Sequence, residues 1–187
     1  MNKGLGIALI AALILVGCGG NAADEARKAR ERNPAPCPSA VVLQDAARQI
    51  EFDGDPSLET VAWSAEFQDV SLYCRYFSDK PIDVEIELSV AVGRGPAAEG
   101  DRHQFAYFVA VTRRDMEVIA KRTFAREVKF GKKERVKTFR EKIDDIVIPR
   151  AREEIAGANF EVVVGLVVTR EQAIYNRSGK SLKFPEL

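Results

Sequence analysis

Histidine, cysteine, methionine and tryptophan are scarce in this chain of 187 residues, which contains one His, three Cys, two Met and one Trp. A zinc site needs several Cys or His ligands, more than this chain can supply. Catalysis of the Ser–His–Asp or Cys–His type would have to use His103, and no Gly-x-Ser-x-Gly motif marks a nucleophile. A lone His beside Asp101, where a loop meets a strand, is typical of a solvated or capping residue. The sequence therefore assigns no catalytic residue, metal ligand or cofactor.

The chain also lacks net charge, because its 28 Lys and Arg residues balance its 28 Asp and Glu residues. No overall field attracts it to nucleic acid, which we exclude as a partner. The apolar share of 46% is ordinary for a globular protein and too high for a disordered one. The length fits one domain, or one domain with a tail.

The longest apolar run lies at the N-terminus, over residues 5–16. It is too short for a membrane-spanning helix, which needs about 20 residues. With Lys3 before it, the run matches the hydrophobic part of a secretion signal. It ends in Leu15-Val16-Gly17-Cys18, which resembles the lipobox of bacterial lipoproteins.

This resemblance implies that residues 1–17 are a signal peptide and that Cys18, with a diacylglyceryl group on its thiol, begins the mature chain. Several acyl chains, at about 0.8 kcal/mol per buried methylene, would anchor the protein stably in a membrane. Gly19 follows the Cys, whereas an Asp there typically retains enteric lipoproteins in the inner membrane. The resemblance thus places the protein in the bacterial cell envelope, facing the periplasm, with the outer membrane favoured. The alternatives are an unlipidated signal peptide with a free or buried Cys, and a short core helix.

Residues 18–36 are expected to form a flexible tether between the lipid and a folded domain at residues 37–187. Residues 23–32 are highly charged and lack an apolar stripe, so a helix there would have nothing to bury. Pro34, Pro36 and Pro38 favour extended backbone.

The remainder of the chain has the alternating apolar pattern of β-strands. In the clearest strand, residues 82–92, every even-numbered residue is apolar. Residues 105–112 are apolar on both faces, which predicts a central strand. The other predicted strands are 40–43, 60–67, 70–77, 118–130, 135–148 and 160–169. A helical turn is expected at 45–50, a short helix at 170–176 and a polar tail at 180–187.

About eight strands separated by turn signals, such as the Gly- and Pro-rich loop at 93–101, predict an all-β fold. We expect an antiparallel β-sandwich with an immunoglobulin-like or similar Greek-key path. Helical segments do not alternate with the strands, which argues against a parallel sheet with helices on both faces.

A disulfide between Cys37 and Cys74 is expected if the chain is exported. Export places both thiols in an oxidising compartment, and with Cys18 lipidated they are the only possible pair. Such a bridge would fasten the end of the tether to the sheet. The alternative is a pair of buried free thiols.

The zero net charge conceals a strong asymmetry. Residues 121–142 carry ten basic and three acidic side chains, whereas residues 43–69 carry one basic and seven acidic ones. On the predicted hairpin of strands 118–130 and 135–148, this charge can simply prevent strands from pairing edge to edge. It can also bind an anionic surface, such as lipid head groups or an acidic envelope partner. Four lysines are the candidate contacts: Lys129, Lys132, Lys133 and Lys137.

Two segments of the body, residues 107–111 and 165–177, are similar to those of small alphaproteobacterial lipoproteins, a resemblance that implies no activity. The sequence therefore predicts a membrane-anchored binding, scaffold or envelope-assembly module. The alternative is an envelope enzyme or a carrier of a small ligand. A deep pocket with acidic groups near His103 would favour that alternative, and a filled core with an exposed patch would favour the module.

Overall fold

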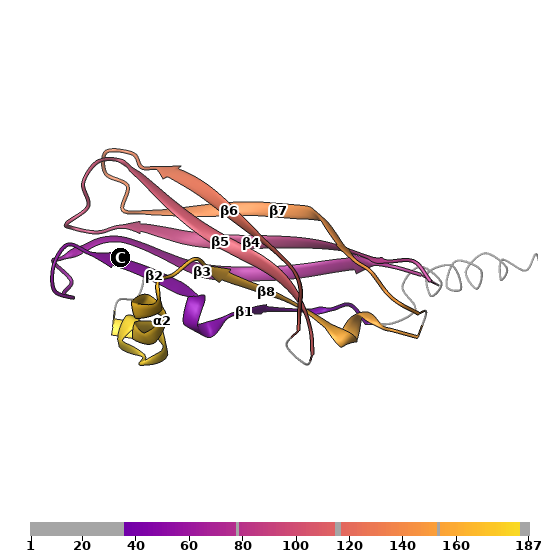
Figure 1. Cartoon of the computed structure of the whole chain (residues 1–187). Helices are drawn as coiled ribbons and strands as arrows, with labels where there is room; N and C mark the ends of the chain where they lie inside the picture. Colours follow the sequence, from indigo (N-terminus) through magenta and orange to yellow (C-terminus); the bar gives the residue numbers. More distant parts are fainter. Residues whose placement is uncertain (1–35, 78, 115–116, 153, 184–187) are drawn as a thin grey trace, which may run out of the picture.

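A computed structural model of the chain describes residues 36–183 except 78, 115, 116 and 153, and it is a sandwich of two β-sheets (Figure 1). The predicted signal peptide, Cys18 and nearly all of the predicted tether lie outside the described residues. The strands are β1 (Ser39–Val42), β2 (Arg48–Phe52), β3 (Val61–Arg75), β4 (Ile82–Arg94), β5 (Arg102–Arg113), β6 (Val118–Lys129), β7 (Val136–Ile148) and β8 (Phe160–Leu166). The helices are α2 (Arg170–Arg177) and three 3-10 helices at Gln44–Ala46, Gly157–Asn159 and Lys180–Lys183.

The strand order confirms the predicted all-β sandwich. One sheet has the order β1–β8–β5–β6 and the other has the order β2–β3–β4–β7. All neighbouring strands are antiparallel except β1 and β8, which run parallel with Ser39 opposite Glu161. The chain changes sheet at four connections, β1–β2, β4–β5, β6–β7 and β7–β8. β5 lies between β8 and β6, as its two apolar faces predict.

β4 supplies the centre of the core. Its even-numbered residues from 82 to 92 are all at most 3% exposed, whereas Asp83 and Glu87 between them face solvent. The facing sheet contributes buried side chains from β5 and β8, of which Tyr107, Val162, Val164 and Leu166 are fully buried. The alternation in the sequence therefore identified the core face of these strands correctly.

β3 joins two strands that the sequence analysis kept separate. Trp63 and Ala65 face the core in its first half, and Leu72 and Cys74 do so in its second half. The inward positions change from odd to even because the pairing with β4 shifts between residues 67 and 69, where a β-bulge inserts an extra residue. The bulge lets one long strand keep both apolar sets inside.

The prediction for residues 45–50 is wrong in its second half, because β2 begins at Arg48. β2 is an edge strand, and α2 covers its free edge. The side-chain amides of Gln172 and Asn176, one helical turn apart, donate to the carbonyls of Ile50 and Arg48, at 3.3 Å and 2.6 Å. A residue pair on the helix thus satisfies two carbonyls that a neighbouring strand would otherwise bond.

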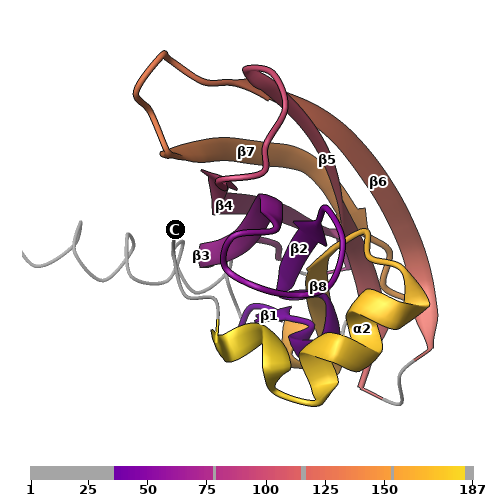
Figure 2. The same cartoon turned by 90° about the vertical axis from the view of Figure 1, so that its left-hand side faces the viewer.

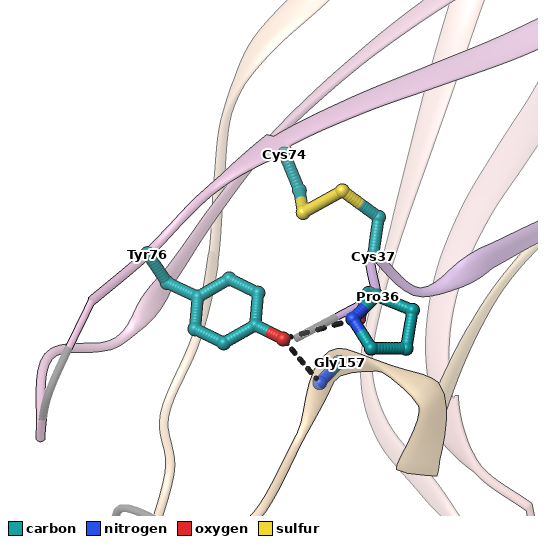
Figure 3. Close-up of a disulfide and its surroundings, with 5 residues drawn as sticks. All are labelled: Pro36, Cys37, Cys74, Tyr76 and Gly157. Carbon is teal, nitrogen blue, oxygen red and sulfur yellow. Dashed lines mark hydrogen bonds between the residues drawn. A yellow bond between two sulfur atoms is a disulfide. The ribbon is translucent and has the colours of Figure 1, made fainter. Parts of the chain in front are cut away.

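The predicted disulfide between Cys37 and Cys74 is present and joins the start of the domain to β3, with the Cα atoms 5.7 Å apart (Figure 3). Beside it, the buried hydroxyl of Tyr76 donates to the carbonyl of Pro36 and accepts from the N–H of Gly157, both at 3.1 Å. Gly157 is required there, because a Cβ atom would lie 2.6 Å from the Pro36 carbonyl oxygen. Residues 36 and 37 are therefore fixed to both sheets.

The sandwich has two ends that differ in what they carry. Along β4, Val84 lies opposite Cys74, and Gly93 lies opposite Val136, which follows the β6–β7 turn. These nine residues of strand separate the disulfide from the turn by about 30 Å. We refer to the Cys37 end, at the right of Figure 1, and to the Lys132 end, at the left, which faces the viewer in Figure 2.

Candidate functional site: the β6–β7 side

β6 and β7 follow each other in the chain but do not form the hairpin that the sequence analysis assumed. β6 is the last strand of one sheet and β7 is the last strand of the other. Both are long edge strands, and the described residues contain no backbone hydrogen bonds between them. The sequence could not reveal this, because two charged strands with a short turn have the same pattern whether they pair or separate.

Side chains cross the opening between β6 and β7 at three levels. Nearest the Lys132 end, the Lys137 ammonium donates to the carbonyl of Lys129 at 2.8 Å. In the middle, Arg126 binds Glu141 through two guanidinium nitrogens. Towards the Cys37 end, Arg122 donates to Asp145 at 2.6 Å. Part of the positive charge of this segment therefore holds the two sheets together along their open side.

The middle level extends into the core through Tyr107 of β5. Its hydroxyl donates to Glu141 at 2.5 Å, and its ring stacks on Phe124 with the ring centres 5.1 Å apart. The Arg122 and Arg126 guanidinium groups lie 5.2 Å and 5.3 Å from the Phe124 ring centre. These contacts come from both sheets, so they fix the distance between them.

The electrostatics of this cluster favour an ionised Glu141 and a neutral Tyr107. Burial opposes ionisation of Glu141, but the hydrogen bonds from Arg126 and Tyr107 outweigh it and lower the pKa of the carboxyl. Burial and the adjacent Glu141 carboxylate raise the pKa of Tyr107 far above its ordinary value. A tyrosine that holds its proton this firmly is suited to donating a hydrogen bond and unsuited to acting as a base.

Sequence reasoning missed this cluster although a signal was present. In β6, Arg126 lies between Phe124 and Val128 on the inward side, and in β7, Glu141 lies between Phe139 and Ile143 on the inward side. Charged residues at inward positions of two strands indicate an ion pair between sheets. The sequence analysis counted both only as part of the net charge.

A small apolar pocket lies beside the Arg122–Asp145 level, with a volume of about 140 Å³. Its floor consists of core residues, among them Val109, Val111 and Ile143. Lys121 and Arg122 line it as well. At this pocket, core residues can be reached from outside.

The four predicted lysines do lie around one turn, at the Lys132 end. Lys132 and Lys133 occupy the turn itself and are exposed. Lys129 and Lys137 flank it, and their ammonium groups lie 3.9 Å from the Asp101 carboxylate and 3.7 Å from the Glu134 carboxylate. Glu134 also accepts from the N–H of Gly131 at 2.8 Å, which fixes the turn. Among the described residues, the two turn lysines have no ion-pair partner.

His103 is not the solvated or capping residue that the sequence suggested. It is only 7% exposed and stacks on Trp63, with the ring centres 4.8 Å apart. The Trp63 ring in turn contacts Phe130. Burial lowers the pKa of His103 to about 4, so the imidazole is neutral at physiological pH. Its position in this aromatic cluster indicates a packing role at the Lys132 end.

The described residues contain no cluster of three or more His, Cys, Asp or Glu side chains arranged to hold a metal ion. Over the same part of the chain, none of the helices has the length and apolar character needed to cross a membrane. No protein-family model, curated protein or solved structure matches this chain.

Proposed function

We propose that this protein is a lipid-anchored module of the bacterial cell envelope that binds an anionic partner with its Lys132 end. The observation that carries the proposal is that the attachment of the N-terminal segment and the unpaired lysines lie at opposite ends of one sandwich. The chain from the N-terminus is fixed at one end by the Cys37–Cys74 bridge, and the unpaired lysines lie at the other. The lipobox-like sequence at Cys18 supports the anchor.

The basic residues of 121–142 divide into two groups with different roles. Arg122 and Arg126 are used inside the molecule, in ion pairs with Asp145 and Glu141. Lys132 and Lys133 are free to meet a partner. Each lysine near an anionic surface contributes about 1 kcal/mol, and the attraction decays within a Debye length of about 8 Å at physiological salt. The turn lysines therefore form the binding group, and Lys129 and Lys137 strengthen its field.

Vesicle binding by the domain from residue 36 onwards, made without the lipid, tests this proposal. The domain should bind vesicles that contain anionic lipid at low salt and should release them as salt increases. Replacing Lys129, Lys132, Lys133 and Lys137 with Gln should abolish most of this binding. A matched control replaces four exposed basic residues away from the turn, Arg75, Lys80, Arg114 and Arg152, with Gln, which removes the same amount of positive charge, and it should retain most of the binding. Equal binding by the lysine variant, or no binding by the parent, would contradict the proposal.

A second function, the carriage of a small apolar ligand, has one observation in its favour, the pocket beside Val109 and Val111. The first function is better supported, because the region around His103, where a buried site was expected, is filled by aromatic rings. Replacing Val111 with Phe would fill the pocket, so binding of a fluorescent fatty acid that survives this change would count against carriage there.

A further inference from the structure

The Cys37 end carries four of the ten large apolar side chains that are exposed among the described residues. Tyr73 is 57% exposed, Phe77 is 46% exposed, and Val118 and Val147 are each 58% exposed. Scattered exposed apolar residues are normal on a protein surface, and Leu58 and Val136 are exposed at the Lys132 end, but these four lie at the end where the N-terminal segment joins the domain.

The strand register places all four at this end. Tyr73 is next to the bridged Cys74, and Phe77 begins the connection from β3 to β4. Val147 lies opposite Asp83, close to the start of β4. Val118 is the first residue of β6, opposite Thr112 near the end of β5. The apolar side chains thus come from both sheets, at the same end of the sandwich as residues 36 and 37.

This end has no net charge to attract an anionic surface. Its three connections, residues 75–83, 113–118 and 149–154, contain equal numbers of basic and acidic residues in the sequence. One of its arginines is also held in place: Arg150 lies 4.8 Å from the centre of the Tyr76 ring and donates to the carbonyls of Lys80 and Ile155. Attraction at this end would come from apolar contact, which salt does not weaken.

We infer that the Cys37 end lies against the surface of the membrane that holds the lipid of Cys18. The inference rests on the proposed anchor and adds the orientation of the domain. The segment between Cys18 and Pro36 leads to this end and spans at most about 65 Å, so the anchored domain stays close to the bilayer. At that range a weak apolar contact is strengthened by the high effective concentration that a tether provides. Tyr73 suits the interface, where aromatic rings that carry a polar group are favoured.

The inferred orientation determines what the Lys132 end can reach. That end lies about 30 Å further from the bilayer, several times the Debye length at physiological salt. The anchoring membrane would then be beyond the reach of Lys132 and Lys133. The anionic partner of the turn must therefore face the anchored domain from the other side.

Fluorescence quenching in vesicles tests the orientation. The full lipidated chain is reconstituted into vesicles with and without brominated lipid, which quenches tryptophan inside or at the surface of the bilayer. Two variants are compared, Phe77→Trp at the Cys37 end and Leu58→Trp at the Lys132 end, both at exposed apolar positions. The parent chain supplies the background from Trp63, which is 8% exposed. Phe77→Trp should lose roughly half of its added fluorescence, because interfacial side chains reach the level of the acyl chains. Leu58→Trp should be unaffected, and raising the salt should leave both results unchanged.

Three outcomes would overturn the inference. Quenching of Leu58→Trp without quenching of Phe77→Trp would mean that the domain lies the other way round. No quenching of either variant, in chains that float with the vesicles, would mean that the domain stands off the bilayer while the anchor is intact. Failure of the parent chain itself to float would overturn the proposed anchor as well, so the two failures are distinguishable.

Discussion

The hydroxyl of Tyr107 donates a 2.5 Å hydrogen bond to Glu141, across the two sheets of the sandwich. Tyr107 is fully buried in β5, and Glu141 lies on the edge strand β7 with its second oxygen bound by Arg126 of β6. The three side chains therefore close a side of the molecule where the backbone makes no hydrogen bonds between β6 and β7 among the described residues. Their arrangement explains why this side remains closed although both edges are unpaired.

Removing the carboxylate of Glu141 should destabilise the fold. Glu141→Ala leaves the Tyr107 hydroxyl buried without an acceptor and Arg126 without its partner, which costs about 2–3 kcal/mol. Urea unfolding at neutral pH measures this loss. The control is Glu127→Ala, which breaks the exposed pair with Arg102 and should cost less than about 1 kcal/mol. Equal losses in the two variants would show that the cluster does not hold the sheets together.

The same carboxylate makes stability depend on pH in a predictable direction. Because the pKa of Glu141 is lower in the folded state than its ordinary value, its contribution is present at neutral pH and is lost as the pH falls through the folded pKa. The difference in unfolding free energy between the parent and Glu141→Gln should therefore shrink on acidification. A difference that stays constant from neutral to acidic pH would contradict the assignment.

His103 should titrate with a pKa of about 4, well below its ordinary value of 6.5. Since the chain has a single His, its imidazole signal in a proton–carbon NMR spectrum needs no assignment. Protonation favours the unfolded state, so up to about 3 kcal/mol of stability is present above pH 6.5 and is lost as the pH falls towards 4. A midpoint near 6.5 would place the ring in solvent instead of against Trp63.

The Cys37–Cys74 bridge should stabilise the domain by about 4 kcal/mol, the value that the chain-entropy model gives for a loop of this length. Replacing both cysteines with Ala should lower the denaturation midpoint accordingly. Gly157→Ala provides a second test of the same region, because its new Cβ would press on the Pro36 carbonyl oxygen. If neither change altered stability, residues 36 and 37 would not be fixed to the sandwich.

The sequence predicted those parts of the fold that depend on local alternation. The inward faces of β4 and β8 and the short helix α2 follow directly from the spacing of apolar residues. The Cys37–Cys74 pair was predicted from the expected export of the chain and from the small number of its cysteines. The β3 bulge changes the phase of alternation, so one strand was read as two. The aromatic environment of His103 depends on its contact with Trp63, which in turn contacts Phe130, and both residues are far from it in the chain.

The candidate site was predicted less completely than the fold. The positions of Lys132 and Lys133 on one turn follow from their adjacency, and the structure places them there. The separation of β6 and β7 into different sheets is a tertiary property, set by which partners β5 and β4 provide. Arg126 and Glu141 form an ion pair between the two sheets because β6 and β7 are separated in this way, and a count of charges along the sequence could not predict that pair.

The most direct test of the central proposal is acyl labelling of the chain expressed in a bacterium, with Cys18→Ala as the comparison. The parent should incorporate a labelled fatty acid, begin at Cys18 in mass spectra, and sediment with membranes. Cys18→Ala should lose the label and leave the membrane fraction. A parent without label, or a Cys18→Ala variant that is labelled and membrane-bound like the parent, would contradict the account.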